Sequence, residues 1–494
     1  MGYILAFDVG TTAVKAILID RATEEMRSAG APCELTQPHP GWAEQSAEQM
    51  WDAVCQASRA CVAAEDVDTA DIAGVVISAP WKHVIPLDEN GKPLRNSIIW
   101  MDGRAISQAA RLNSTMGRFV EHAQGYWTRL LWLKENEPEI WAKAKYIVGI
   151  NDYFKYRATG NLCTECSDDF IHSPNRQLQQ LYDEVLEKTS LAEDAWKFPP
   201  SIACTDCACY LSEEGAAQLG LQPGTPMFGG FGDLPAVYLG SGCREEGTAH
   251  IYLGTSSWFG ELLPDRVDNY SSSWFTADGQ HQGALFGLTT GGRAYEWVIN
   301  RFYREEREKL GDGIYALLDR EMAQVVPGCD GLIVTHWLNG EPPPLAKNAK
   351  AVFFNVTEQH DRRHFVRAML ESICYSHRRS LEKYVRHHGF PPRQLRVVGG
   401  GACSDVWMQM MADILQLPIH VPDNPRYVGT MGAYYCALIG LGVKKDFSDL
   451  GRHSGGKVFV PNPENAAVYD KMFGVYMDLY PALKDLYDRM NGVY

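Results

Sequence analysis

The sequence lacks any apolar run long enough to cross a membrane. The longest apolar stretch, near Tyr434 to Val443, is far shorter than the ~20 residues that a membrane-spanning helix needs. The amino-terminal segment lacks the basic region of a signal peptide, and Asp8 interrupts its apolar stretch. We therefore expect a cytoplasmic protein with no membrane partner.

An excess of basic residues is also missing. Lys and Arg total 46 against 61 Asp and Glu, so the formal net charge is −15. Proteins that bind duplex nucleic acid need an excess of Lys and Arg on at least one face. The composition therefore argues against a nucleic-acid partner, whereas a nucleotide bound at a local site is compatible with this charge.

The common nucleotide-binding motifs do not occur. There is no complete G-x-x-x-x-G-K-[ST] loop, and no G-x-G-x-x-G opens a helix after a strand. The H-R-D and D-F-G motifs of protein kinases are missing too. If the protein binds a nucleotide, it does so through a different sequence motif.

The 13 cysteines form no clear metal-binding or disulfide pattern. Their number is odd, and residues 167–203 separate the pair Cys163–Cys166 from the pair Cys204–Cys207, which Cys209 follows. Neither pair has the glycine turn of a zinc knuckle. Reduced, uncoordinated thiols are therefore the favoured hypothesis, and a zinc site is the less favoured alternative.

What the chain does contain is an internal repeat. Residues 3–9 and 14–20 read as two apolar strands around a Gly10-Thr11-Thr12 turn, which predicts a tight β-hairpin. The stretch AHIYLGTSSWFGELL repeats this setting, and its Gly254-Thr255-Ser256 turn lies 244 residues further along. A repeat at this scale predicts two related domains, residues 1–246 and 247–494.

The remaining patterns predict mixed α/β domains. MWDAVCQASRACVAA (residues 50–64) has the periodicity of an amphipathic helix, and GVVISAP (74–80) and SIIW (97–100) read as strands. In the second half, residues 395–416 read as a strand, a glycine turn and a helix. The fold class is therefore α/β in both halves.

Two Gly/Thr turns and one carboxylate could together carry phosphate chemistry. Backbone N–H groups and hydroxyls in such turns form anion-binding concavities, although one copy alone is weak support. Asp233 lies among the glycines of GGFGDLPAVYLGSG, which allow a ligand to approach the backbone closely. Asp233 also reads as the first residue of a helix with a Pro in its first turn, and a structural capping role and a catalytic role are compatible.

These motifs together resemble the FGGY family of carbohydrate kinases, in its xylulokinase-like branch. The resemblance runs in collinear order through essentially the whole chain. The segments that carry it are DVGTTAVK (8–15), IIWMDGRA (98–105), LLWLKENEPEIWAKAKYIVGINDYFKYRATG (130–160), GTPMFGGFGD (224–233), YLGTSS (252–257), TTGGRAYEW (289–297) and VVGGGACSDVWMQMMADILQLPI (397–419).

The resemblance implies two actin-like, ribonuclease-H-like domains with ATP and sugar in the cleft between them, and a homodimer would be ordinary for the family. It implies that Asp233 is the general base and that Asp8 is the carboxylate of the Mg²⁺ and phosphate site. The implied nucleotide contacts are Gly10, Thr11, Thr12, Lys15, Gly254, Thr255, Ser256, Gly291, Gly292, Gly400 and Gly401. The implied sugar-side residues are Trp81, Lys82, Trp100, Asp102, Arg104 and Asp233.

One departure from the family bears on the substrate. Where the xylulokinase branch has Q-M-H-G, this chain has Pro80-Trp81-Lys82-His83, so that Lys82 stands at the sugar-contacting His position. One hypothesis is a loop repacked around Trp81, with Lys82 in water. The other is that Lys82 adds a cationic donor to the pocket and favours an acidic or differently hydroxylated substrate.

Other departures leave the phosphate turns untouched. The Arg of one family segment is Pro342 here, and the following Gly-Leu is Asn355-Val356. In the first domain, Tyr126 and Arg129 replace the usual Pro and Lys. The expectation is an ATP-dependent kinase that phosphorylates a terminal hydroxyl of a ketose or polyol, with a weakened homologue that senses sugar or nucleotide as the alternative.

Overall fold

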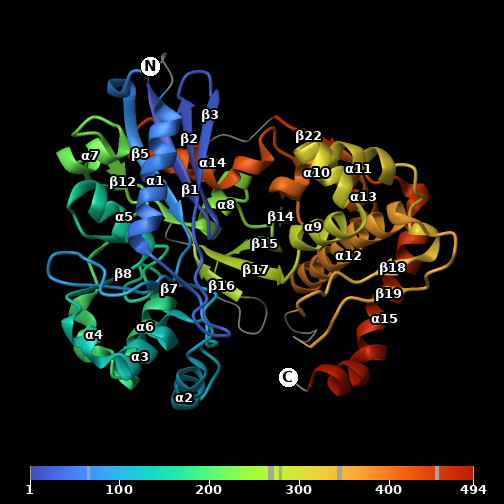
Figure 1. Ribbon diagram of the computed structural model, residues 1–494, viewed down its shortest axis with the longest axis horizontal. Coiled ribbons are helices and arrows are strands. Elements are labelled where there is room, and N and C mark those ends of the chain that lie inside the picture. Colours follow the sequence, from blue (N-terminus) through green and yellow to red (C-terminus); the bar gives the residue numbers. More distant parts are fainter. Residues whose placement is uncertain are drawn as a thin grey trace.

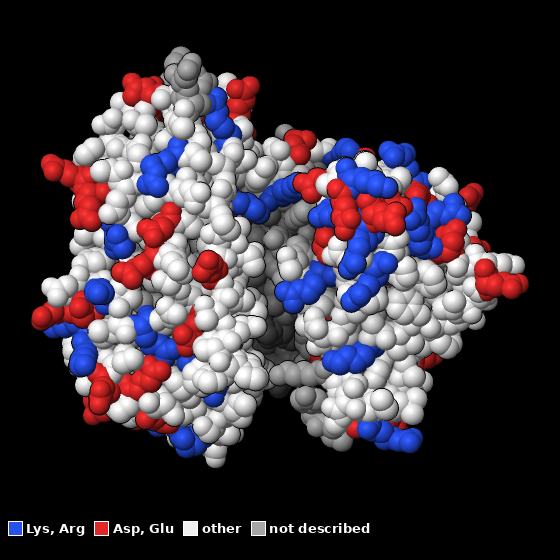
Figure 2. Space-filling model, in the orientation of Figure 1, with Lys and Arg blue, Asp and Glu red and all other residues white. Residues whose placement is uncertain are grey.

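The computed structural model describes residues 2–63, 67–264, 272–277, 281–341, 348–450 and 455–492. Two lobes, each built around a mixed β-sheet, lie side by side (Figure 1). The space-filling view shows a groove between them (Figure 2). None of the helices in these ranges combines the length and the hydropathy that a membrane span requires.

The sheet of the first lobe has the strand order β11-β12-β5-β1-β2-β3, with β13 also paired to β5. β1, β2 and β3 form an antiparallel meander, and β5 runs parallel to β1. The strands are β1 (Tyr3–Val9), β2 (Ala13–Asp20), β3 (Met26–Pro32), β5 (Ile72–Ala79), β11 (Cys207–Tyr210), β12 (Pro226–Phe228) and β13 (Phe231–Gly232).

Helices cover both faces of this sheet, which explains why β1 is apolar from Ile4 to Phe7. Successive side chains of a strand point to opposite faces. Leu5, Phe7 and Val9 share a buried cluster with helix α1 (Ala47–Val62). Ile4 and Ala6 share another with helix α14 (Val428–Gly440). Asp8 continues the second series, so its side chain belongs to the α14 face.

The first lobe also has a largely helical part, which lies below its sheet in Figure 1. Three short strand pairs brace it: β4 (Glu44–Gln45) with β7 (Ser97–Ile98), β6 (Ile85–Leu87) with β8 (Tyr146–Val148), and β9 (Thr164–Glu165) with β10 (Ser201–Ile202). The other helices of the first lobe are α2 (Ile106–Met116), α3 (Tyr126–Asn136), α4 (Pro138–Lys143), α5 (Ile150–Thr159), α6 (Arg176–Lys188), α7 (Glu213–Leu219) and α8 (Asp233–Ser241).

The second lobe repeats the arrangement, with the strand order β16-β17-β15-β14-β20-β21-β22. β14 pairs antiparallel with β15 and parallel with β20, as β1 does with β2 and β5. The predicted internal repeat is therefore confirmed. The strands are β14 (Thr248–Leu253), β15 (Ser257–Leu263), β16 (Ser272–Phe275), β17 (Gln282–Leu288), β20 (Gln394–Val398), β21 (Ile419–Val421) and β22 (Lys457–Phe459).

Helices of the second lobe pack around Trp337, Trp407 and Tyr476, which are almost fully buried. A short pair of strands, β18 (Ile333–Val334) and β19 (Phe353–Phe354), lies beside them. The helices are α9 (Gly292–Phe302), α10 (Arg304–Leu310), α11 (Ile314–Met322), α12 (Arg362–His388), α13 (Asp405–Leu415) and α15 (Ala466–Asn491).

Helix α14 comes late in the chain but packs in the first lobe, against α8 and the first sheet. The two helices touch through their backbones, because a methyl group at Gly240 of α8 would lie 1.7 Å from the carbonyl oxygen of Val428. A methyl group at Gly432 of α14 would lie 2.1 Å from the carbonyl oxygen of Ala236. The predicted boundary between residues 246 and 247 stays a prediction. In space the chain returns to the first lobe at α14.

This contact predicts a sharp stability difference between two glycines. Gly240→Ala should lower the free energy of unfolding by about 2–4 kcal/mol, because the helices must separate to admit the methyl group. Gly474→Ala is the matched control: it lies inside α15 with open space around it and should add about 0.5–1 kcal/mol. Thermal unfolding measures both, and an unchanged melting temperature for Gly240→Ala would contradict the close crossing.

Candidate active site

Asp8 lies beside the first turn of α14 and Asp233 lies in the first turn of α8, near enough for the charge of Asp8 to act on Asp233. Asp8 lies near the end of β1, and a methyl group at Gly429, in the first turn of α14, would lie 3.6 Å from its Cγ. Asp233 opens α8, and its Oδ1 accepts a hydrogen bond of 2.9 Å from the N–H of Leu234. The two carboxylates therefore sit beside the first turns of two crossing helices.

Burial raises the pKa of both acids, and the charge of Asp8 adds to the shift of Asp233. Burial, followed by the charge of Asp8, raises the pKa of Asp233 to about 7. Burial also raises the pKa of Asp8, although Lys15, with its Nζ 3.9 Å from Oδ2 of Asp8, opposes that shift. Two like charges this close favour a bound cation, and Asp8 has part of its side chain exposed to receive one.

Tyr252 occupies the position of the second lobe that corresponds to Asp8, two residues before the glycine of the turn. Its ring stacks on Trp258 with centroids 4.0 Å apart. A methyl group at Gly254 would lie 2.7 Å from the Tyr252 hydroxyl oxygen, so the hydroxyl lies over the second turn. Burial makes the largest contribution to the raised pKa of Tyr252, and the charges of Asp8 and Asp233 raise it further. Tyr252 thus belongs to the site, which sequence reasoning missed because the residue type alone signals core packing.

The first predicted phosphate turn is closed by a hydrogen bond of 2.8 Å from the N–H of Gly10 to the carbonyl oxygen of Ala13. The Oγ1 of Thr11 accepts a hydrogen bond of 3.3 Å from the indole Nε1 of Trp100. Thr12 is exposed. The structure therefore brings the turn together with Trp100, which was predicted on the sugar side and has 42% of its surface exposed.

The second predicted turn is bound to the start of helix α9. The N–H of Gly292 donates to the carbonyl oxygen of Gly254 over 2.7 Å, and the N–H groups of Gly291 and Arg293 donate to Thr255. A methyl group at Gly291 would lie 2.6 Å from the Cβ of Ser257, and one at Gly292 would lie 2.5 Å from the oxygen of Gly254. Only glycine permits this close approach.

The third glycine turn lies against the same strand end. Gly399 has a φ of +95°, and its added methyl group would meet the backbone of Leu253 at 2.6 Å. A methyl group at Gly401 would lie 2.8 Å from the Cβ of Leu253, whereas one at Gly400 would meet nothing within 4 Å. The structure thus brings the predicted nucleotide residues of the second lobe together around the end of β14.

Asp102 and Arg104, which were predicted on the sugar side, form hydrogen bonds and ion pairs within the protein. The carboxylate of Asp102 accepts from the N–H of Ala43 at 2.5 Å and pairs with Arg104 at 2.8 Å. The guanidinium of Arg104 also pairs with Glu44 at 2.7 Å and stacks over Trp42. Both side chains are fully buried. This network holds the loop that carries Trp100, and the Nη1 of Arg104 keeps no hydrogen-bond partner among the described residues.

Of the other two, Trp81 lies beside the residue that precedes the candidate base. Ala79, the last residue of β5, pairs with Gly232, and a methyl group at Gly232 would lie 3.4 Å from the ring of Trp81. Lys82 follows with a φ of +60° and is half-buried, its Nζ 5.3 Å from the ring centroid of Trp81. The hypothesis of a lysine in open water is therefore disfavoured.

Other departures from the family lie elsewhere. Arg129 is buried in α3, where its Nη1 donates to the carbonyl oxygen of Ile98 over 2.9 Å. Tyr126 opens the same helix. The side chain of Asn355 donates to the carbonyl oxygen of Gly331. Pro342 lies outside the described residues.

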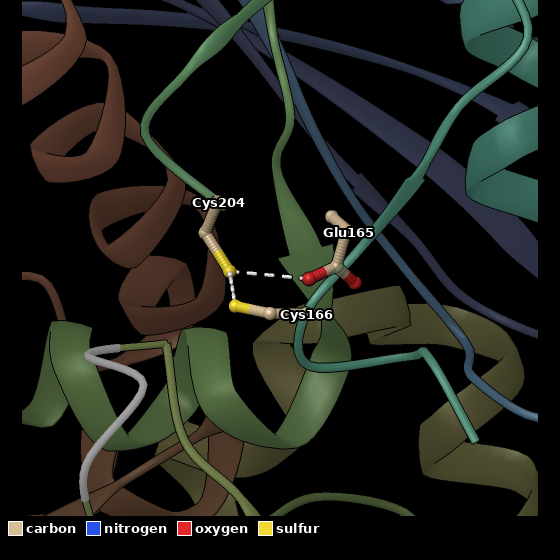
Figure 3. Close-up of side chains that lie close together, drawn as sticks. All are labelled: Glu165, Cys166 and Cys204. Atoms are coloured by element: carbon tan, nitrogen blue, oxygen red, sulfur yellow. Dashed lines mark hydrogen bonds between the residues drawn. The ribbon is translucent and has the colours of Figure 1, made fainter. Parts of the chain in front are cut away.

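Glu165, Cys166 and Cys204 form a buried cluster in the first lobe (Figure 3). The Sγ atoms of the two cysteines are 3.4 Å apart, and the thiol of Cys204 donates to Glu165 over 3.1 Å. All 13 cysteines carry free thiols. Ser167 connects the cluster to the site, since its Oγ donates to Glu165 and accepts from the N–H of Gly232, each over 3.0 Å.

Each lobe of the repeated α/β fold carries a Gly/Thr turn after its first strand, and Asp8 and Asp233 lie near enough to Tyr252 for their charges to act on it. Models of the FGGY family of carbohydrate kinases match the chain, the N-terminal domain at residues 3–240 and the C-terminal domain at 249–441. The chain therefore belongs to the FGGY family of carbohydrate kinases.

Named relatives span nearly the full chain. It is 27% identical to the xylulose kinase of Bacillus subtilis (strain 168), covering 98% of both. It is 29% identical to the L-xylulose/3-keto-L-gulonate kinase of Escherichia coli (strain K12), covering 99% of both. The fold matches a ligand-bound xylulose kinase from Lactobacillus acidophilus with a TM-score of 0.84 at 24% identity, over 99% of this chain and 100% of that one. The two-domain fold and the carbohydrate kinase class are thus confirmed.

The raised pKa of Asp233 predicts a pH-dependent stability gain for Asp233→Asn. In the wild type the folded state resists ionisation, so stability falls as the pH rises from the ordinary Asp pKa towards about 7 and stays low above it. The Asn variant should therefore melt at a higher temperature than the wild type at pH 8, and the difference should shrink at pH 5. Thermal melts in EDTA measure this, and a pH-independent difference would contradict the shift.

Proposed function

We propose that the protein transfers the γ-phosphoryl group of ATP to a terminal hydroxyl group of a ketose or polyol, xylulose-like by default, with Asp233 as general base. The observation that carries this proposal is the carboxylate of Asp233 in the first turn of α8, where burial and then the charge of Asp8 raise its pKa to about 7. A base with a pKa near the working pH is suited to take a proton from a hydroxyl group. The names of the sugar kinase relatives support the same reaction.

The reaction follows from these positions. Asp233 accepts the proton of the sugar hydroxyl as its oxygen bonds to the γ-phosphorus, the bond from that phosphorus to the β-phosphate oxygen breaks, and ADP leaves. Phosphoryl transfer of this kind depends chiefly on positioning and charge neutralisation. The N–H groups and hydroxyls of the two turns hold the phosphates, and the Tyr252 hydroxyl adds a donor beside the second turn.

Asp8 fits a magnesium ion. Its carboxylate is partly exposed, its one ion-pair partner among the described residues is Lys15 at 3.9 Å, and its charge acts on a second acid, Asp233, so that the two offer oxygen ligands to a hard divalent cation. When bound, Mg²⁺ would neutralise charge on the transferred phosphoryl group. Lys15, exposed beside the first turn, would contact the phosphates from the protein side.

The sensor alternative is disfavoured because both carboxylates and both turns are in place. We further propose that the protein works in the cytoplasm, where free thiols persist, and that it binds no nucleic acid, in line with its net charge of −15. A homodimer is proposed as the assembly, and light scattering after size-exclusion chromatography would test it.

Asp233→Asn tests the base. It should lower kcat for ATP-dependent phosphorylation of D-xylulose and other ketoses or polyols by about 10²–10⁴, since the amide cannot accept the proton. Asp52→Asn, on the exposed face of α1, is the control and should retain wild-type activity. A coupled assay of ADP release with a panel of acceptors measures both variants. Wild-type activity of Asp233→Asn would contradict the assignment of Asp233 as the base.

Asp8→Asn tests the metal site separately. It should raise the Mg²⁺ concentration needed for half-maximal activity by about tenfold or more, because one negatively charged ligand is lost. The affinity for ADP without Mg²⁺ should stay within about twofold or increase slightly, because a charge near the phosphates is removed. Magnesium titration of activity and calorimetric ADP binding in EDTA give the two values; weakened ADP binding with unchanged Mg²⁺ dependence would contradict the assignment.

A further inference from the structure

The loop that follows β5 carries Lys82, one of the residues predicted to lie on the sugar side. β5 pairs through Ala79 with Gly232, the residue before Asp233. Three residues of chain reach at most about 10 Å, so Lys82 begins within this distance of that pair. This reach is of the same order as the length of an open five- or six-carbon sugar. One end of such a substrate can therefore lie at Asp233 while the other lies at Lys82.

The ammonium of Lys82 has no ion-pair partner at contact distance among the described residues, and Glu121 is the carboxylate that acts on it most strongly. Among the residues that the structure describes, its Nζ has neither an ion pair nor a hydrogen bond, and it lies over two aromatic rings, 5.3 Å from the centroid of Trp81 and 5.5 Å from that of Phe170. Such rings hold a cation in place without neutralising it. Burial lowers the pKa of Lys82, which an incoming carboxylate would reverse.

The backbone of the loop is fixed in an unusual conformation. Lys82 has a φ of +60°, in the left-handed region that a lysine seldom adopts. Its N–H donates to Oδ1 of Asp168 over 2.8 Å, which holds the residue in place. Strain of this kind clusters at binding sites, where the surrounding structure maintains it.

The neighbouring carboxylates are engaged with backbone groups. Glu121 accepts hydrogen bonds from the N–H groups of Tyr126, Trp127 and Thr128 at the start of α3. Asp168 accepts the N–H of Lys82. Burial raises the pKa of both acids, so it disfavours their charged forms.

A second buried cation, the guanidinium of Arg129, adds positive charge near Lys82. The guanidinium of Arg129 donates only to the carbonyl oxygens of Gly125 and Ile98, and its Nη2 has no hydrogen-bond partner among the described residues. Arg129 also acts electrostatically on Lys82 and lowers its pKa. A buried charge without a partner is costly, and an anionic ligand would compensate it.

We propose that Lys82 binds a substrate carboxylate and that the preferred phosphoryl acceptor is a sugar acid, an aldonate or keto-aldonate, rather than a neutral ketose or polyol. The inference rests on the proposed function, because the same site and the same base transfer the phosphoryl group. The carboxylate lies against Lys82, and the terminal hydroxyl at the far end of the carbon chain gives its proton to Asp233. The acid is phosphorylated at that hydroxyl, and ADP is released.

Matched acceptors test the charge alone. D-gluconate and D-glucitol, and D-xylonate and xylitol, differ within each pair only in a carboxylate against a hydroxymethyl group. With the full-length enzyme and Mg-ATP, kcat/KM for at least one acid should exceed that of its alditol by about tenfold or more, as one charge-assisted hydrogen bond provides. D-xylulose and L-xylulose serve as neutral ketoses.

Three variants connect the preference to Lys82. Lys82→Met should lower the ratio of acid to alditol kcat/KM by roughly 10- to 100-fold, and Lys82→Arg should largely keep it. Lys92→Met, an exposed lysine in the same lobe, is the control and should leave the ratio unchanged. ADP binding by calorimetry shows that each variant is folded.

The outcomes separate the two proposals. An enzyme that phosphorylates a neutral ketose but no acid, or whose acid preference survives Lys82→Met, overturns the sugar-acid inference and leaves the proposed function standing. An enzyme that phosphorylates none of these acceptors and binds no ADP overturns both. An acid preference that falls in Lys82→Met and persists in Lys82→Arg supports the inference.

Discussion

The arrangement of the site depends on the backbone contact between α8 and α14. Gly240 and Gly432 let the two helices cross without side chains between them. The first turn of one helix carries Asp233, and the first turn of the other packs against Asp8. Both acids are thereby held in a largely buried place, where burial raises the pKa of each and the charge of Asp8 raises that of Asp233 further. A looser crossing would separate the acids and return Asp233 towards the pKa of an ordinary surface carboxylate.

The electrostatic design is asymmetric, although the fold is a repeat. β1 and β14 pair with their neighbours in the same way and end in similar turns, yet Asp8 in the first lobe corresponds to Tyr252 in the second. The first lobe therefore contributes negative charge, suited to a metal ion and to proton acceptance. The second contributes neutral donors and glycines that approach a nucleotide closely. Phosphoryl transfer needs both kinds of surface facing each other.

Local patterns predicted the α/β fold and the internal repeat. The two hairpin turns, α1, α13 and the position of Asp233 follow from spacing, glycines and apolar periodicity, all of which are readable within short windows. Long-range packing decided the rest. No local signal shows that Asp102 and Arg104 bury their charges against Glu44 and Ala43, or that the ring of Tyr252 folds over Gly254. The return of α14 to the first lobe was equally invisible, because an apolar helix does not reveal which sheet it covers.

That return has a consequence for the order of folding during synthesis. One face of β1 is covered by α14, which lies beyond residue 427 in a chain of 494. While the ribosome is still making the second lobe, Ile4, Ala6 and their neighbours on that face have no helix to cover them. The amino-terminal half therefore cannot complete its core until most of the chain has emerged. A nascent chain in this state exposes apolar strand surface, the kind of surface to which chaperones bind.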